Sequence, residues 1–191
     1  MTITISAVIL AGGQARRMNG QDKGLQQFKN KCLIEHIYTR LSSQIAAIAI
    51  NANRNIMDYK KFGLPVFSDE LSGFQGPLSG MLTALKTATT DFVLFTPCDT
   101  PFIPLNLCQK LQSAIEKHNA LIAYVYDGER EHPICCLVST KLTDKLDLYL
   151  QEGNRKVLQF LKENNGIAVD FSEQKKAFIN MNTLADLQST S

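Results

Sequence analysis

The sequence lacks any apolar run of the roughly 20 residues that a membrane-spanning helix requires. Its first apolar stretch, Ile3–Leu10, is much shorter than that, and no basic residues precede it. A secretory signal peptide carries a basic segment ahead of its apolar core, so this start argues against one. We therefore expect a cytoplasmic protein that has no membrane partner.

Cysteine and histidine pairs at metal-binding spacing are also missing. The number of cysteines, five, is odd, and none of them forms a C-x-x-C motif. The histidines, His36, His118 and His132, are scattered and form no ligand pair at helical spacing, which argues against a zinc site. We expect reduced thiols of a cytosolic protein. The cysteines are Cys32, Cys98, Cys108, Cys135 and Cys136.

A strong charge imbalance is absent as well. Lysine and arginine number 20 and aspartate and glutamate 18, which gives a net charge of +2. This balance argues against a protein that binds nucleic acid through bulk positive charge. Repeats and Pro/Gly/Ser-rich linkers are missing too, and 191 residues fit one domain, so we expect a single domain over 1–191.

Short β-branched runs instead alternate with amphipathic stretches along the whole chain. Such alternation predicts an α/β fold: a three-layer Rossmann-like sandwich with a mostly parallel sheet. The Tyr126–Pro133 turn region predicts an antiparallel hairpin at one edge. The expected strands are Ile3–Leu10, Ile45–Asn51, Pro65–Ser68, Phe92–Thr96, Leu121–Tyr126, His132–Val138, Ile167–Phe171 and Phe178–Asn180. The expected helices are Lys31–Gln44, Leu78–Ala88, Pro104–His118, Thr143–Leu150, Arg155–Asn164 and Leu184–Gln188.

Ligands of such sheets bind outside the carboxyl ends of the strands, and polar residues follow several strands here. After the first strand, Gly12 and Gly13 allow backbone amides to approach an anion closely. Arg16, Arg17 and Lys23 add positive charge suited to a triphosphate. The Walker pattern and the G-x-G-x-x-G pattern are both absent. The alternative is an ordinary glycine-rich turn with a solvated basic face.

An aspartate follows the most apolar strand. Asp99 comes directly after Phe92–Thr96 and lies between Pro97 and Pro101. A carboxylate at the end of a buried strand faces the ligand crevice, and Mg²⁺ prefers carboxylates together with phosphate and water oxygens. The alternative is an aspartate that caps the following helix.

Two further strand ends carry groups suited to a purine base. Asn51 has an amide that both donates and accepts hydrogen bonds, and the carboxylate of Asp69 can accept from the N1–H and N2–H₂ groups of guanine. Both residues could equally belong to strand-terminating turns. The Gly76–Gly80 segment begins the next helix, where free amides can bind a ribose or phosphate oxygen. Its alternative is a plain loop-to-helix junction.

Several of these residues form motifs that resemble those of a known family. Leu10-Ala11-Gly12-Gly13, then Arg17-Met18, Gly20 and Asp22-Lys23, resembles the L-A-G-G-x-x-x-R-M-G-x-D-K signature of the nucleotidyltransferase superfamily. Pro97-Cys98-Asp99-Thr100-Pro101 resembles its P-C-D-x-P motif. Over nearly its whole length the chain is similar to the molybdenum cofactor guanylyltransferase family. It departs from that family at Asn19, at the Cys135-Cys136 pair and at Leu184, which replaces a proline.

The resemblance implies transfer of GMP from GTP to the phosphate of molybdopterin, which forms molybdopterin guanine dinucleotide and releases pyrophosphate. It implies Mg²⁺ on Asp99, with Mn²⁺ as a substitute, and an Asp22 that orients Lys23. The implied catalytic residues are Arg17, Lys23 and Asp99. The implied GTP site comprises Leu10, Ala11, Gly12, Gly13, Lys23, Asn51, Asp69, Gly76 and Asp99. The implied molybdopterin site, mostly in the C-terminal third, comprises Gly80, Arg155, Lys156, Asn180 and Asn182.

Three alternatives remain at this stage. The enzyme could use CTP or a sugar-phosphate acceptor, as related nucleotidyltransferases do. The chain could also be a module that senses GTP without turnover, although the presence of both Lys23 and Asp99 argues against this. Arg155 and Lys156 could be a solvated helix face. The expected partners besides GTP and molybdopterin are other proteins of molybdenum cofactor biosynthesis and molybdoenzyme chaperones.

Overall fold

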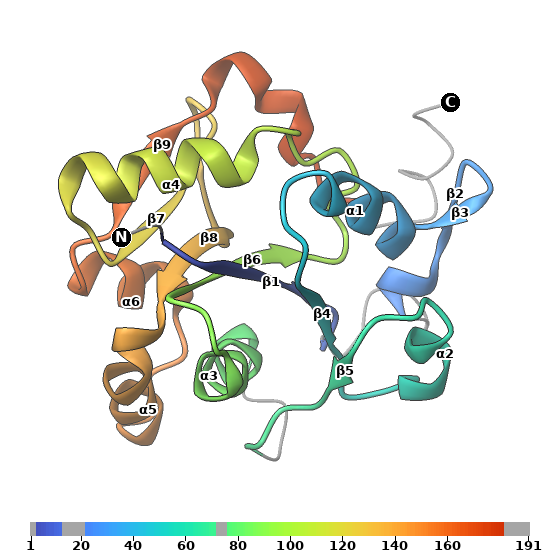
Figure 1. The fold of residues 1–191 in the computed structure, drawn as a ribbon, viewed down its shortest axis with the longest axis horizontal. Coiled ribbons are helices and arrows are strands. Elements are labelled where there is room, and N and C mark those ends of the chain that lie inside the picture. Colours follow the sequence, from blue (N-terminus) through green and yellow to red (C-terminus); the bar gives the residue numbers. More distant parts are fainter. Residues whose placement is uncertain (1–2, 13–21, 72–75, 182–191) are drawn as a thin grey trace.

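The chain forms a seven-stranded sheet with helices on both faces (Figure 1). The computed structural model describes residues 3–12, 22–71 and 76–181. The strands of the main sheet are β1 (Ile5–Leu10), β4 (Ile48–Asn51), β5 (Val66–Phe67), β6 (Phe92–Pro97), β7 (Ile122–Tyr126), β8 (Glu131–Ser139) and β9 (Ile167–Asp170). The α-helices are α1 (Leu33–Ser42), α2 (Ile56–Lys60), α3 (Pro77–Thr87), α4 (Leu107–His118), α5 (Thr143–Gln151) and α6 (Val157–Glu163).

The strands are arranged in the order β5-β4-β1-β6-β8-β7-β9. Strand β8 pairs antiparallel with both of its neighbours, while every other pairing in this sheet is parallel. The mostly parallel sheet and the β7–β8 hairpin are therefore confirmed. The hairpin lies near one edge, with β9 paired beyond it as the outermost strand.

Apolar side chains of the sheet divide between two cores because successive residues of a strand point to opposite faces. Ile9 of β1 belongs to one core, with residues of α1 and α4, whereas Val8 and Leu10 belong to the other, with residues of α3, α5 and α6. Helix α1 contributes Ile34, Ile37 and Leu41 at helical spacing. The result is the predicted sandwich of three layers.

Local chemistry explains where two helices end or begin. Pro77 occupies the first turn of α3, where its missing amide hydrogen costs no hydrogen bond. Helix α4 begins at Leu107 rather than at Pro104, because Pro104 accepts from the Leu107 amide in a preceding turn. The same helix ends at Asn119, which adopts a left-handed conformation with φ of 48°.

The prediction of a strand over Phe178–Asn180 is wrong. A 3-10 helix, η3 (Ser172–Phe178), covers this region and ends at Phe178. Phe178 is buried against Phe171 and His132, and the Met181 amide donates to the Asp99 carbonyl instead of to a sheet neighbour. Tertiary packing thus replaces strand pairing here. The expected helix Leu184–Gln188 lies outside the described residues.

Among the described residues in the first third of the chain, four short elements were not predicted. The turn η1 (Lys23–Leu25) leads into a small antiparallel hairpin of β2 (Gln27–Phe28) and β3 (Lys31–Cys32), and α2 follows β4. Lys29 and Asn30 both have positive φ, at 47° and 65°, which is the conformation of a two-residue hairpin turn. Hairpins of this length carry little apolar periodicity, so pattern reading misses them.

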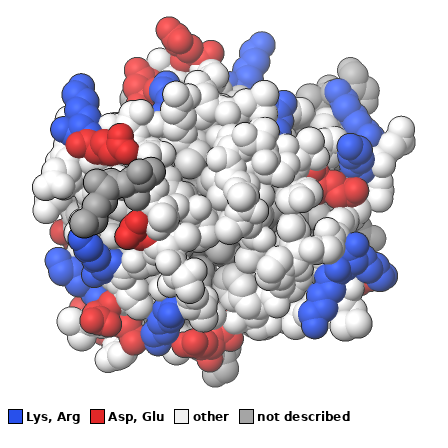
Figure 2. Space-filling model, in the orientation of Figure 1, with Lys and Arg blue, Asp and Glu red and all other residues white. Residues whose placement is uncertain are grey.

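Charged side chains of both signs lie around the rim of the face seen in Figure 2, and the centre of that face is mostly uncharged. Among the described residues, none of the helices combines the length and apolar character that a membrane crossing requires.

Candidate active site

The carboxyl ends of three adjacent strands form the candidate site. Strand β1 lies between β4 and β6, and Leu10 is in register with Asn51 on one side and Pro97 on the other. Hydrogen bonds continue beyond these strands, since the Ala11 amide donates to the Asn51 carbonyl at 2.8 Å and the Cys98 amide to the Leu10 carbonyl at 3.1 Å. The three polar strand ends that the sequence singled out are therefore neighbours.

Lys23 and Asp99 form an ion pair across this edge of the sheet. Lys23 Nζ lies 3.0 Å from Asp99 Oδ2, although the two residues are 76 positions apart in the chain. Asp99 is 9% exposed, so its charge is largely removed from water. A buried carboxylate requires a positive partner. The pair therefore joins Lys23, at the start of η1, to the carboxylate that follows β6.

The chemistry of Asp99 fits a magnesium ligand. Mg²⁺ is commonly held by one or two carboxylates, with substrate phosphates and waters completing an octahedron. Among the described residues no three His, Cys, Asp or Glu side chains gather as a ligand set. Asp99 would supply one carboxylate to such an ion. Asp99 does not cap helix α4, which begins at Leu107. The helix-cap alternative is thereby excluded.

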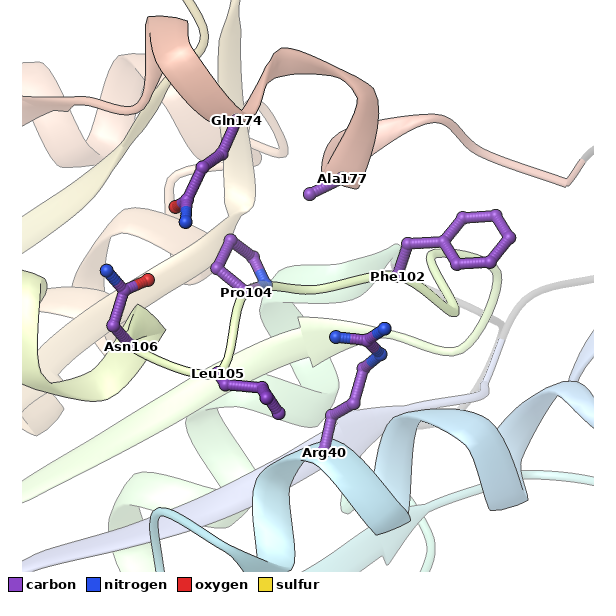
Figure 3. A pocket seen from close by; sticks show the side chains of 7 residues that line it. All are labelled: Arg40, Phe102, Pro104, Leu105, Asn106, Gln174 and Ala177. Atoms are coloured by element: carbon purple, nitrogen blue, oxygen red, sulfur yellow. The ribbon is translucent and has the colours of Figure 1, made fainter.

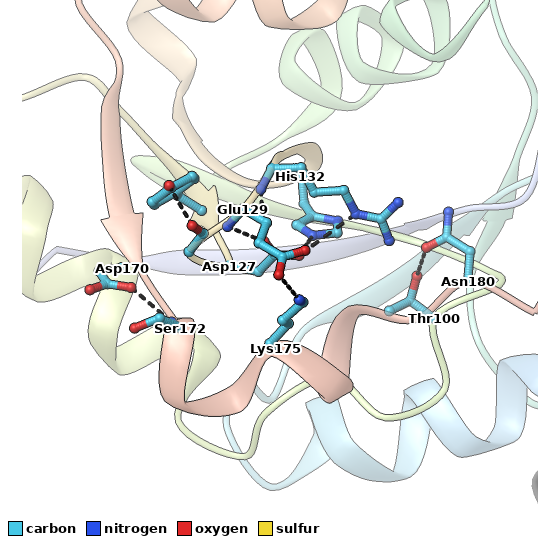
Figure 4. Close-up of polar contacts among 11 residues, drawn as sticks. Thr100, Asp127, Glu129, His132, Asp170, Ser172, Lys175 and Asn180 are labelled. Atoms are coloured by element: carbon cyan, nitrogen blue, oxygen red, sulfur yellow. Dashed lines mark hydrogen bonds and ion pairs between the residues drawn. The ribbon is translucent and has the colours of Figure 1, made fainter.

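The Asp99 loop also contacts the predicted acceptor residue Asn180. Thr100 Oγ1 donates to Asn180 Oδ1 at 3.2 Å, and the next amide along, that of Met181, donates to the Asp99 carbonyl at 2.8 Å. Figure 4 shows Thr100 and Asn180 facing each other, with Asp127 and His132 nearby on the β7–β8 hairpin. The structure thus brings Asn180 beside Asp99, whereas the sequence placed them in separate subsites.

Asn51 and Asp69 form a second polar group on the other side of β1. Asn51 Nδ2 donates to Asp69 Oδ1 at 2.8 Å, and Asn53 Oδ1 accepts from the Asp69 amide at 2.9 Å. Asn51 is 2% exposed, so its amide is fixed in place. The two predicted base-binding residues therefore act as one unit. Asn53 was missed as part of this unit, although the Asn-Ala-Asn spacing places both amides on one side of the strand end.

Two glycines leave room for the Asn51 side chain. A Cβ at Gly80 would lie 2.3 Å from Asn51 Oδ1, and one at Gly12 would lie 3.2 Å from the same atom. Gly80, in the first turns of α3, thus adjoins Asn51 of the predicted GTP site, although the resemblance assigned it to the molybdopterin site. Gly76 precedes this helix with φ of 84°, a conformation that favours glycine.

Arg155 and Lys156 lie at the connection between α5 and α6. Arg155 Nη1 donates to the carbonyls of Leu150 and Asn154, at 2.8 and 2.6 Å, and so binds the end of α5. Tyr149 Oη donates to the Lys156 carbonyl at 3.1 Å. These contacts give Arg155 a role in helix capping. The role of Arg155 and Lys156 in molybdopterin binding stays a prediction.

Three residues of the expected site lie outside the described residues. They are Gly13, Arg17 and Asn182.

The thiol of Cys98 lies next to Asp99 in the chain and is buried. Cys98 is 8% exposed, and burial, followed by the nearby charges of Asp99 and Asp22, raises its pKa well above the usual value. Burial likewise raises the pKa of Cys135 to about 12. A neutral thiol is a poor nucleophile. Cys98 thus packs as a small hydrophobe, and all five cysteines are free.

A separate hollow of roughly 410 Å³ lies between α1, the loop before α4 and η3 (Figure 3). Arg40 lines it, but its Nη1 donates to the Ile103 carbonyl at 3.2 Å and so supports the loop. The other lining residues are Phe102, Pro104, Leu105, Asn106, Gln174 and Ala177. None of them is a residue of the three strand ends.

Comparisons with known proteins agree with this geometry. Residues 7–166 match the family of the MobA-like NTP transferase domain. The chain is 63% identical over 190 residues to the molybdenum cofactor guanylyltransferase of Haemophilus influenzae, which covers 100% of this chain and 99% of that protein. It is 61% identical over 189 residues to the enzyme of the same name from Pasteurella multocida, covering 99% of this chain and 100% of the relative.

Solved structures share the fold. The molybdopterin-guanine dinucleotide biosynthesis protein A of Archaeoglobus fulgidus superposes with a TM-score of 0.78 at 22% identity, over 96% of this chain and 95% of that one. The 4-diphosphocytidyl-2C-methyl-D-erythritol synthase of Anaerococcus prevotii gives a TM-score of 0.76 at 14% identity, over 98% and 94% of the two chains.

Proposed function

The chain belongs to the molybdenum cofactor guanylyltransferases of the MobA-like NTP transferase family, and we propose that it transfers GMP from GTP to the phosphate of molybdopterin. The products are molybdopterin guanine dinucleotide and pyrophosphate. The observation that carries the catalytic assignment is the contact between Lys23 and Asp99, at 3.0 Å. This pair supplies a mobile positive charge and a metal-binding carboxylate at one strand edge.

The chemistry is an in-line displacement at phosphorus. A phosphate oxygen of molybdopterin forms a bond to the α-phosphorus of GTP, while the bond from that phosphorus to the bridging oxygen breaks and pyrophosphate leaves. A phosphate monoester is already anionic at neutral pH, so the nucleophile requires no strong general base. The protein therefore acts by positioning and by neutralising charge.

Lys23 and Asp99 divide the work on the triphosphate. Bound to Asp99, Mg²⁺ or its substitute Mn²⁺ would offset the negative charge that develops on the phosphates. Lys23, whose Nζ lies 3.0 Å from Asp99 Oδ2, would contact phosphate oxygens of the same triphosphate. Arg17 adds a second positive charge in this proposal. The Ala11 amide is already bonded to the Asn51 carbonyl, so this proposal assigns the approach to the anion to the amides of the glycines that follow, Gly12 and Gly13.

Asn51 and Asp69 account for the choice of guanine. Asp69 Oδ1 already accepts from Asn51, which leaves the other carboxylate oxygen to accept from a base. Guanine presents two adjacent donors, N1–H and N2–H₂, whereas adenine presents an acceptor at N1. A fixed carboxylate therefore favours guanine and repels adenine. We propose that Asn180, which accepts a hydrogen bond from Thr100 next to Asp99, contacts the acceptor phosphate.

We expect the reaction to take place in the cytoplasm and to involve further proteins. The five free thiols suit the reducing cytoplasm. The dinucleotide product must be passed on, so other proteins of molybdenum cofactor biosynthesis and molybdoenzyme chaperones are the protein partners we expect.

A nucleotide panel tests the proposal. The purified chain is incubated with molybdopterin, Mg²⁺ and GTP, CTP, ATP or UTP in turn, and product masses are measured with pyrophosphate release. We expect a product one GMP unit heavier than molybdopterin, with GTP alone. Product with CTP instead would assign the enzyme to the cytidylyl branch. GTP binding without pyrophosphate, even with acceptor present, would indicate a sensing module.

A further inference from the structure

The position of Lys23 depends on the short turn that carries it. Lys23 begins η1, which spans only Lys23–Leu25, and a turn of this length has too few internal hydrogen bonds to hold its own shape. Its flanking residues, Asp22 and Gly24, are both buried. What contacts those two residues therefore decides where the Lys23 ammonium group lies.

Tyr59 contacts Asp22 from helix α2. Tyr59 Oη donates to Asp22 Oδ1 at 2.5 Å, and Asn55 Nδ2 donates to the other oxygen at 3.3 Å. Asp22 is 6% exposed, so its carboxylate depends on these donors. The Asp22 carbonyl in turn accepts from Gln26 Nε2 at 3.2 Å. These contacts anchor η1 through Asp22, the residue that precedes it.

Tyr59 also packs against the residue on the other side of Lys23. A Cβ at Gly24 would lie 2.5 Å from Tyr59 Oη and 3.2 Å from the nearest ring carbon. Gly24 is thus required for the tyrosine to approach the turn. Tyr59 contacts both neighbours of Lys23 and leaves the lysine side chain to extend toward Asp99.

The hydroxyl of Tyr59 remains a donor under all ordinary conditions. The side chain is fully buried, and burial, followed by its neighbours Cys98 and Asp22, raises the pKa of Tyr59 far above its usual value. Tyr59 therefore donates to Asp22 as a neutral phenol at neutral pH. A phenylalanine would fill the same space and would lack only this bond.

From these contacts we infer that Tyr59 is a positioning residue for the transfer reaction: its hydroxyl fixes Asp22 and so directs Lys23 at Asp99 and at the triphosphate. The inference rests on the proposed function, because its main readout is the use of GTP. It assigns a catalytic purpose to α2, a helix that contributes no group to the reaction itself. It also gives a route by which Asp22 orients Lys23, through the backbone of η1.

A double-mutant cycle separates this role from a merely structural one. Tyr59→Phe, Lys23→Met and the double variant are compared with the wild type by kcat and KM for GTP, together with thermal unfolding. We expect Tyr59→Phe to lower kcat/KM for GTP by about tenfold or more, as loss of a buried charge-assisted hydrogen bond commonly does. In the Lys23→Met background the same change should have no further effect. Tyr124→Phe is the matched control, because its buried hydroxyl also lies near a carboxylate, Glu131 Oε1 at 3.3 Å.

Two outcomes would overturn the inference. Tyr59→Phe could leave kcat/KM for GTP unchanged, or its loss could multiply with that of Lys23→Met, which would mean that the two residues act independently. A wild type that makes product with a different nucleotide would refute the proposed function instead. The cycle would then be run with that nucleotide, and the inference about Tyr59 would still be decided.

A steric test uses the same contact. Gly24→Ala should impair GTP use, because its Cβ would lie within 2.5 Å of Tyr59 Oη. Combining it with Tyr59→Phe removes the hydroxyl, so the nearest ring carbons, at 3.2 and 3.3 Å, become the closest atoms. We expect the double variant to exceed Gly24→Ala alone in unfolding temperature. If Gly24→Ala lowered the unfolding temperature equally in the wild type and in Tyr59→Phe, that result would contradict the contact.

Discussion

At the scale of single residues, the reactive groups depend on a few buried side chains that hold them. Asp99 is buried and paired with Lys23, its carbonyl accepts from the Met181 amide, and its neighbour Thr100 donates to Asn180. Asn51 is fixed by Asp69 in the same way. Removing the charge of one such side chain, or adding a methyl group beside it, should therefore change function.

The charge of Asp99 gives the first prediction. Asp99→Asn keeps the shape of the side chain and removes its charge, so we expect turnover to fall about 100-fold or more, in line with losses of electrostatic stabilisation in other enzymes. Pyrophosphate release from GTP and molybdopterin measures the effect. Asp91→Asn is the matched control, because Asp91 precedes strand β6 whereas Asp99 follows it. Near-wild-type turnover of Asp99→Asn would refute the metal assignment.

Space around Asn51 gives the second prediction. Alanine normally stabilises a helix interior relative to glycine by about 1 kcal/mol. Gly80→Ala should instead destabilise the protein, because its Cβ would lie 2.3 Å from Asn51 Oδ1. We expect a lower unfolding temperature and a higher KM for GTP. Ser79→Ala is the control on the neighbouring residue. Its buried Oγ has no hydrogen-bond partner among the described residues, so removal should leave stability unchanged or raised.

At the scale of elements, pattern reading succeeded where burial on both faces dictates composition. All residues of Phe92–Thr96 are buried, and their unbroken apolar run predicted β6. Helix α3 was predicted from Pro77 and its apolar face. The failures are elements whose conformation comes from distant contacts. Phe178 looked like a strand residue because it is apolar, but it packs on His132 as part of a 3-10 helix.

The β7–β8 hairpin is an element whose stability should depend on pH. Asp127 Oδ2 lies 2.6 Å from His132 Nε2, and Asp127 Oδ1 accepts from the amides of Glu129 and Arg130. Burial alone would raise the pKa of Asp127, but these hydrogen bonds outweigh it and lower the pKa well below its usual value. The hairpin also contacts η3 through an ion pair between Glu129 and Lys175.

The sign of the effect follows from this shift. A carboxyl group whose folded pKa is lowered stabilises the fold above its unfolded pKa of about 3.9, and this contribution is lost as the pH falls toward the folded value. We therefore expect the wild type to lose its advantage over Asp127→Asn between about pH 5 and pH 2. Urea unfolding of both proteins across this range is the measurement. A difference that stays constant with pH would contradict the assignment.

At the scale of the whole molecule, the sequence predicted the fold class but not which residues would meet. Strand order places β1 between β4 and β6, and only this order brings Gly12, Asn51 and Asp99 to one edge. The motifs themselves indicated each residue separately. Contacts such as Lys23 with Asp99, or Tyr59 with Asp22, join segments that are 76 and 37 positions apart. Local pattern carries no information about such pairs, so their geometry could come only from the structure.

The central claim is that GTP binds across the carboxyl ends of β1, β4 and β6 with its metal on Asp99. The most direct test is a crystal structure with Mn²⁺ and a GTP analogue that cannot be cleaved at the α-phosphorus, recorded with anomalous data. We predict a manganese peak within coordination distance of Asp99, guanine against Asp69, and the Lys23 ammonium group moved from Asp99 to the phosphates. Nucleotide bound elsewhere, or a metal peak away from Asp99, would contradict the account.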